Sequence, residues 1–61
     1  MNNVKNMHRL PLICKCDKGF YPIDPAPTKY TEEEYARLNG ERNAHINSIE
    51  DFNGVVLWER K

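Results

Sequence analysis

Apolar and polar residues alternate near the start of the chain, which predicts a half-buried strand over Leu10–Cys16. Its inner face would carry Leu10, Leu12, Cys14 and Cys16, and its outer face Pro11, Ile13, Lys15 and Asp17. The tripeptide Asp17-Lys18-Gly19 then predicts a hairpin turn with the glycine in a left-handed position. Residues Phe20–Ile23 predict the returning strand, and Pro22, which cannot donate to a ladder, places that strand at an edge of the sheet.

A helix is predicted after the proline-rich connector of residues 24–28. Thr31 and Glu34 form a capping-box pattern, and Tyr30 is placed to pack on the first turns. Gly40 interrupts the following segment and leaves open a break into two shorter helices. Asn53-Gly54 is typical of a helix end. Between these signals, apolar residues recur on one stripe that predicts a helix of about 20 residues: Tyr35, Leu38, His45/Ile46 and Ile49.

The last strand, Val55–Glu59, is apolar on both faces, with Val55 and Leu57 on one and Val56 and Trp58 on the other. These elements predict an α+β domain over residues 8–61 with the order ββαβ, preceded by a flexible leader over residues 1–7. The single helix would pack on one face of a three-stranded antiparallel sheet of order 2-1-3. The other face, with Ile13, would then have no cover.

The size of the chain limits what such a domain can bury. A protein of 61 residues and 7.2 kDa buries only about 60% of its unfolded surface. The gain from burial is close to the conformational entropy that folding removes, so a good core, a staple or a partner is needed. Deep pockets of several hundred Å³ need larger walls, and no catalytic motif is recognisable. We therefore expect a non-enzymatic protein that needs no cofactor.

The charge balance argues against a polyanionic partner. Nine Lys and Arg residues equal nine Asp and Glu residues, whereas sequence-independent nucleic-acid binding needs several uncompensated cations. Positive charge is in excess over residues 1–22 and negative charge over residues 23–36, a segregation that suits a complementary protein surface. The apolar run Leu10–Cys14 is too short for a signal peptide or a membrane span. We expect a cytoplasmic protein with no membrane partner.

One metal site is an alternative prediction. Cys14 and Cys16 with His8 and His45 supply four zinc ligands, and a structural zinc would add folding energy. However, C-x-C on a strand departs from the usual C-x(2–4)-C spacing of such sites. Our preferred interpretation is that both cysteines are small buried hydrophobes.

The residues without predicted cover suggest a binding surface. Arg42 interrupts the apolar stripe of the helix, and Asn39, Asn43 and Asn47 flank it. The candidate partner-binding residues are Ile13, Tyr21, Val56, Trp58, Asn39, Asn43 and Arg42. We hypothesise a module that docks on and inhibits a larger intracellular protein, as small phage or mobile-element accessory proteins do, or that forms a homodimer through the same face.

A second function class remains open at this stage. Tyr21 and Trp58 could stack bases of single-stranded nucleic acid, with Lys15, Lys18 and Arg60 holding the phosphates. The balanced net charge makes this alternative the less favoured one.

Overall fold

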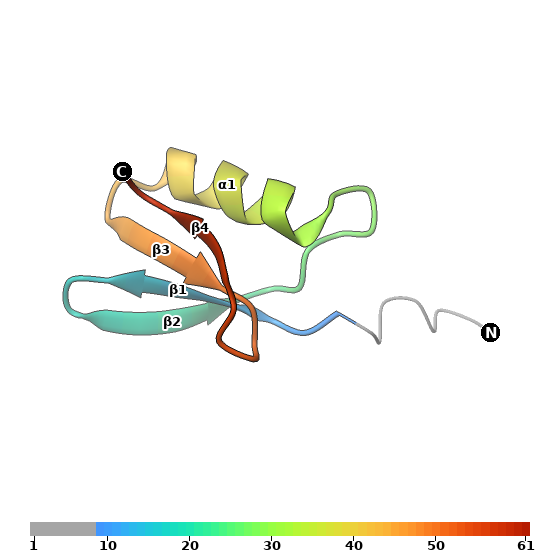
Figure 1. Ribbon diagram of the computed structural model, residues 1–61, viewed down its shortest axis with the longest axis horizontal. Helices are drawn as coiled ribbons and strands as arrows, with labels where there is room; N and C mark the ends of the chain where they lie inside the picture. The colour runs from blue at the N-terminus through green and yellow to red at the C-terminus, as the bar shows by residue number, and fades with distance from the viewer. Residues whose placement is uncertain (1–8) are drawn as a thin grey trace.

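The computed structural model describes residues 9–61, which form one sheet and one helix (Figure 1). The elements in chain order are β1 (Leu12–Cys16), β2 (Gly19–Ile23), α1 (Glu32–Arg42), β3 (Ile46–Glu50) and β4 (Val56–Glu59). The α+β class is confirmed, but the antiparallel sheet has four strands in the order β2-β1-β3-β4 rather than three. The predicted leader over residues 1–7, and His8, lie outside the described residues.

The prediction of one long helix is wrong after Arg42. Helix α1 has 11 residues, and the apolar residues Ile46 and Ile49 belong to β3 instead. They are three residues apart, as on a helix, yet both are buried on the same side of the sheet. A bulge explains this spacing, because Cys16 pairs with Ile46 and Lys15 with Ser48, which leaves Asn47 as an extra residue.

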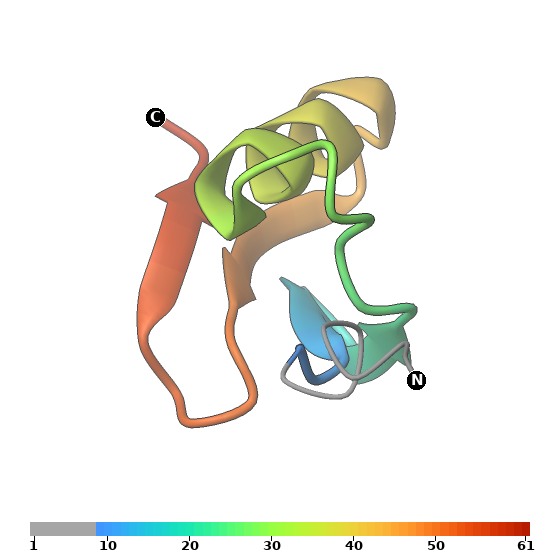
Figure 2. The same ribbon diagram turned by 90° about the vertical axis from the view of Figure 1, so that its right-hand side faces the viewer.

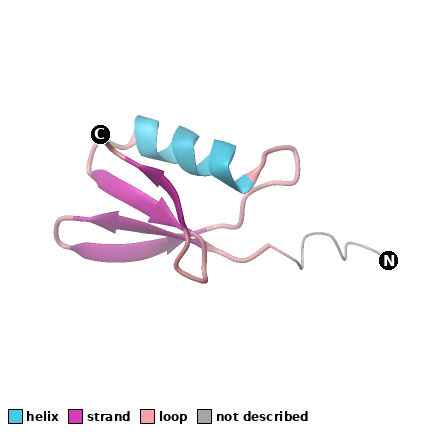
Figure 3. Ribbon diagram, in the orientation of Figure 1, coloured by secondary structure: helices cyan, strands magenta, loops and turns pink. Residues whose placement is uncertain are grey.

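The Asn53-Gly54 pair ends no helix but forms part of the β3–β4 hairpin turn (Figure 3). Asp51 organises this turn, since its Oδ1 accepts hydrogen bonds of 2.9 Å from the backbone N–H groups of Asn53 and Val55. Gly54 has φ +90°, a left-handed conformation that glycine adopts without strain.

Several local signals in the first half of the chain are confirmed, but Leu10 precedes β1 and is 45% exposed instead of lying on the inner face of the strand. Thr31 and Glu34 form both bonds of the capping box, at 2.9 and 3.0 Å, and the rings of Tyr30 and Tyr35 lie 5.7 Å apart across the first turn. Gly19 has a positive φ of +150°, but it begins β2, so the first hairpin turn has two residues, Asp17 and Lys18, rather than the three predicted. Strand β2, which carries Pro22, lies at an edge of the sheet as expected.

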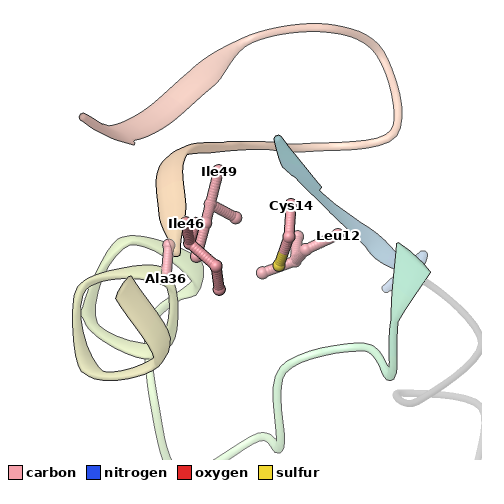
Figure 4. Packing of buried hydrophobic residues seen from close by; sticks show 5 residues of the cluster. All are labelled: Leu12, Cys14, Ala36, Ile46 and Ile49. Carbon is pink, nitrogen blue, oxygen red and sulfur yellow. The ribbon is translucent and has the colours of Figure 1, made fainter. Parts of the chain in front are cut away.

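The core lies between the sheet and the helix. Figure 4 shows the side chains of Ile46 and Ile49 from β3 beside Ala36 of α1, with Leu12 and Cys14 of β1 facing them. All five are essentially inaccessible to solvent. Helix α1 packs mainly on β3 and β4, and the connector from β2 to α1 runs along the same side of the sheet (Figure 2).

Arg9 holds that connector in place. Its Nη1 lies 3.2, 2.8 and 2.7 Å from the carbonyl oxygens of Ala26, Pro27 and Tyr30. Ala26 is only 4% exposed and is the part of the connector that reaches the interior. A single guanidinium thus satisfies backbone acceptors that a proline-rich segment cannot pair within a helix or strand.

The C-terminal end of α1 is attached to β4 by two side chains. The Trp58 ring lies directly against Gly40, where any side chain would overlap it. Arg60 lies over the same ring, with its Cζ 5.0 Å from the ring centroid. Its guanidinium donates to the carbonyls of Gly40, Asn43 and Ile46 at 2.8, 3.1 and 3.0 Å, so a cation neutralises the negative end of the helix dipole.

We expect Gly40→Ala to destabilise the protein, although alanine is the better helix former by about 1 kcal/mol. The added methyl group would push the Trp58 ring out of its site at a cost of about 1–3 kcal/mol. Urea denaturation measures the change. In a Trp58→Ala background the same substitution should be neutral or stabilising, and a stabilising effect in the wild-type chain would contradict this packing.

We expect Arg60→Ala to lower the free energy of unfolding by roughly 1–2 kcal/mol, because three carbonyls lose a charged donor at a partly exposed site. Arg37→Ala is the matched control. Arg37 lies on α1 but only pairs with Glu41 in solvent, at 3.6 Å, so its loss should stay below about 0.5 kcal/mol. Equal effects of the two substitutions would show that the contacts of Arg60 add nothing.

Candidate functional site

The face of the sheet opposite α1, which we call the open face, is covered by no helix or strand of the described residues (Figure 2). The strand register places eight residues on it in two rows across the sheet: Pro22, Ile13, Glu50 and Val56, then Phe20, Lys15, Ser48 and Glu59. Phe20 is 71% exposed and Val56 52% exposed. Apolar side chains at both edges are therefore open to contact.

An ion pair occupies the middle of the open face. Lys15 Nζ lies 3.0 Å from Glu50 Oε2, across the two central strands β1 and β3. The Glu50 side chain is 18% exposed and that of Lys15 is 47% exposed, so the pair is partly shielded. Apolar residues flank it, with Ile13, Phe20 and Pro22 on the side of β2 and Val56 on the side of β4.

The two edges of the sheet are poorly suited to pairing with another strand. In the β1–β2 hairpin, Cys16 and Gly19 close a two-residue turn, and the residues that close such a turn are a hydrogen-bonded pair in a regular antiparallel ladder. The alternation along β2 then directs the nitrogen of Pro22 away from β1, so the outer edge lacks one donor. On β4 the extra residue Leu57 disrupts the regular spacing of the edge. The open face is thus the better surface for contact.

Ile13 and Val56 lie on the open face, as the sequence predicts. Trp58 does not share that face, because Ile49 pairs with Trp58 whereas Glu50 pairs with Val56. The expectation that Val56 and Trp58 point the same way assumed strict alternation and is wrong, since the bulge at Leu57 reverses it.

Tyr21 also lies on the helix side of the sheet, opposite Cys14. Its hydroxyl is 2.7 Å from His45 Nε2, and the two rings stack with centroids 5.9 Å apart. This contact ties β2 to the turn between α1 and β3. Tyr21 and Trp58 are therefore used within the fold, and a role for either in binding stays a prediction.

The asparagines of the predicted ladder bond within the chain. Asn39 Nδ2 donates to the Tyr35 carbonyl and Asn43 Nδ2 to the Asn39 carbonyl, both at 2.9 Å. Asn47, in the bulge of β3, donates to Asp17 at 2.7 Å. Arg42 is exposed in the last turn of α1. None of these four residues belongs to the two rows of the open face, and their role in binding also stays a prediction.

Phe20 and Pro22 are the surface residues that the sequence analysis did not select. The signal that could have found them is the register of the hairpin, which aligns Phe20 with Lys15 and Pro22 with Ile13. Once the Asp17–Lys18 turn fixes that register, these two residues must share a face with Ile13.

A hollow of about 290 Å³ opens at one end of the sheet. It is lined by Cys16, Asp17, Lys18, Ala44, His45 and Asn47. Among residues 9–61 there is no group of three or more His, Cys, Asp or Glu side chains that could hold a metal ion. Because His8 lies outside the described residues, the zinc alternative stays an untested prediction.

The cations expected to hold phosphates already have partners, apart from Lys18. Lys15 pairs with Glu50, and Arg60 bonds to backbone carbonyls at the end of α1. These contacts weaken the alternative of a single-stranded nucleic-acid binder, because its electrostatic term depends on cations that are free to meet phosphates.

Two groups on the helix side of the sheet, Cys14 and Tyr21, have shifted pKa values. Burial, and then the neighbouring Cys16, raise the pKa of the Cys14 thiol above its ordinary value of 9.0. Burial followed by the two nearby thiols raises the pKa of the Tyr21 hydroxyl above 10.0. Both shifts favour the protonated forms in the folded protein.

No helix in residues 9–61 is long and apolar enough to cross a membrane. No protein-family model, curated protein or solved structure matches this chain.

We expect the stability of the protein to fall as the pH rises above about 9, because the unfolded chain releases the Cys14 proton before the folded chain does. Below about pH 8 both states keep the proton and this group has no effect. Cys14→Val should flatten the decline in thermal midpoint between about pH 8 and 10. An undiminished decline in that variant would show that the thiol is not its source.

Proposed function

We propose that this chain is a non-enzymatic protein-binding module that docks on a larger protein through the open face. The observation that supports the proposal is the set of apolar side chains on that face, Ile13, Phe20, Pro22 and Val56, which no described helix or strand covers. Leaving such a group in water forfeits hydrophobic free energy that a partner would recover.

Phe20 is the expected anchor of the contact. Its ring is the most exposed of the large apolar side chains in residues 9–61, and it shares its face of β2 with Pro22. An aromatic side chain has few rotatable bonds and therefore gains contact area at a small cost in conformational entropy, which is typical of residues that dominate binding energy. The Lys15–Glu50 pair beside it would orient the partner through charge.

The proposed effect on the partner is inhibition in the cytosol, as for small accessory proteins of phage or mobile elements. A sheet face that covers a functional surface blocks access to it without any chemistry of its own. The small area of the face favours a site on a larger protein where a few side chains decide the outcome.

The proposal is tested by photo-crosslinking in cells that make the protein. A benzophenone amino acid at position 20 should give one discrete adduct with another protein on irradiation, whereas the same probe in place of Glu33, exposed on α1, should not. Excess wild-type chain should suppress the adduct, and excess Ile13→Asp chain should not, provided that circular dichroism shows this variant folded. The same adduct from both positions, or none from position 20, would overturn the proposal.

A further inference from the structure

We infer that, without its partner, the open face docks on the open face of a second copy of this chain, which forms a weak two-fold symmetric dimer. The inference rests on the proposed function, because it describes how the same surface is regulated. In the free protein the second copy covers the face, and the partner must displace it.

The first support is the charge pattern of the face. A two-fold interface needs a surface that is complementary to itself. Lys15 and Glu50 carry opposite charges on the two central strands, β1 and β3. A two-fold axis that runs parallel to the strands, between β1 and β3, lays β1 of each copy over β3 of the other. Lys15 of each copy then comes near Glu50 of the second copy. Each charged group thus has one oppositely charged partner in its own chain and one in the other chain.

The apolar residues obey the same symmetry. The operation that lays β1 over β3 also lays the edge strand β2 over the other edge strand, β4. Because Pro22 and Val56 lie in the same row across the sheet, Pro22 of one copy meets Val56 of the second copy. Phe20 lies two residues from Pro22 in β2, in the row that ends at Glu59, so the operation places its ring over the Glu59 side chain of the second copy and next to Val56. Both apolar edges are thus covered by one operation.

The size of the face sets the strength of this dimer. Four strands at about 4.8 Å spacing and about 16 Å length give a flat area of roughly 300 Å². Allowing for side-chain relief, the two copies together would bury about 1,000 Å², which is the lower limit for a specific interface. A dimer of this size dissociates readily, so a partner with a better fit can replace the second copy.

The consequence is a competition between self-association and docking. Monomers bind the partner and dimers do not, so the apparent affinity for the partner falls as the concentration of the chain rises. The dimer also hides the exposed Phe20 ring until the partner is present. Strand addition offers no rival mode, because Pro22 and the bulge at Leu57 disrupt both edges.

Charge reversal with rescue tests the inference by sedimentation equilibrium over a concentration series. The wild-type mass should rise from 7.2 kDa toward twice that value. Lys15→Glu places four carboxylates at the centre of the interface, and Glu50→Lys places four ammonium groups there. Each single variant should associate at least about tenfold more weakly than the wild type.

Two combinations should restore pairing. An equimolar mixture of Lys15→Glu and Glu50→Lys should form a heterodimer, and the double variant Lys15→Glu/Glu50→Lys should form a homodimer again. Circular dichroism of each variant checks that folding is intact, since both residues lie on the surface of the sheet. Merely weakened folding would not be rescued by mixing two separate chains.

The inference is overturned if the wild type stays at the monomer mass at the highest concentration, if the single variants associate as well as the wild type, or if the mixture stays monomeric. These outcomes are distinct from failure of the proposed function. A monomeric wild type that crosslinks to another protein through position 20 overturns the dimer alone. A dimer that gives no adduct with another protein supports the pairing and overturns docking on a larger partner.

Discussion

The contact between Gly40 and the Trp58 ring is the constraint on which the rest of the fold depends. The buried residues of α1 are Ala36 and Gly40, four residues apart on one face of the helix. With such small side chains the helix has little apolar surface of its own to bury. It binds the sheet because its backbone comes close, and because Trp58 fills the space that a side chain at position 40 would occupy. The helix thus depends on β4 as much as β4 depends on the helix.

That constraint also explains how the open face arises. With one short helix, the chain covers only one side of its four strands, and Tyr21, Ile23, Tyr35, Leu57 and Trp58 complete that side around the buried cluster. Little apolar material is left for the opposite side, where the Lys15–Glu50 pair lies between apolar edges. A domain this small has few residues with which to cover both faces of its sheet, so one face remains open to another chain.

Features whose signals lie within a few residues could be predicted from the sequence. The capping box at Thr31 and the turn at Asp17-Lys18-Gly19 involve neighbours only, and Pro22 excludes its strand from the centre of a sheet by itself. The third strand could not be predicted in this way. Ile46 and Ile49 have the spacing of a helix stripe, and only pairing with β1, which is distant in sequence, shows that Asn47 is a bulge. Asn53-Gly54 carried a hairpin signal that the helix interpretation obscured. On the surface, alternation identified Ile13 and Val56 but misplaced Trp58, because a bulge leaves no mark in the pattern.

The bulge at Leu57 has a consequence for how the length of the chain can vary. The Asp51 turn fixes the start of β4, where Val56 pairs with Glu50. Arg60 fixes its end, through its own backbone bond to Asn47 and its side-chain bonds to the end of α1. Between these two fixed points, β4 has one residue more than the facing segment of β3, and Leu57 is that extra residue. Loss of this one residue would make Val56 and Trp58 consecutive in a regular strand, so each would keep its own side of the sheet, and only the contact of Leu57 with the core would be lost. The register of the hairpin can therefore survive a deletion at this position. In an ordinary strand, the same deletion would turn every following side chain to the opposite face of the sheet.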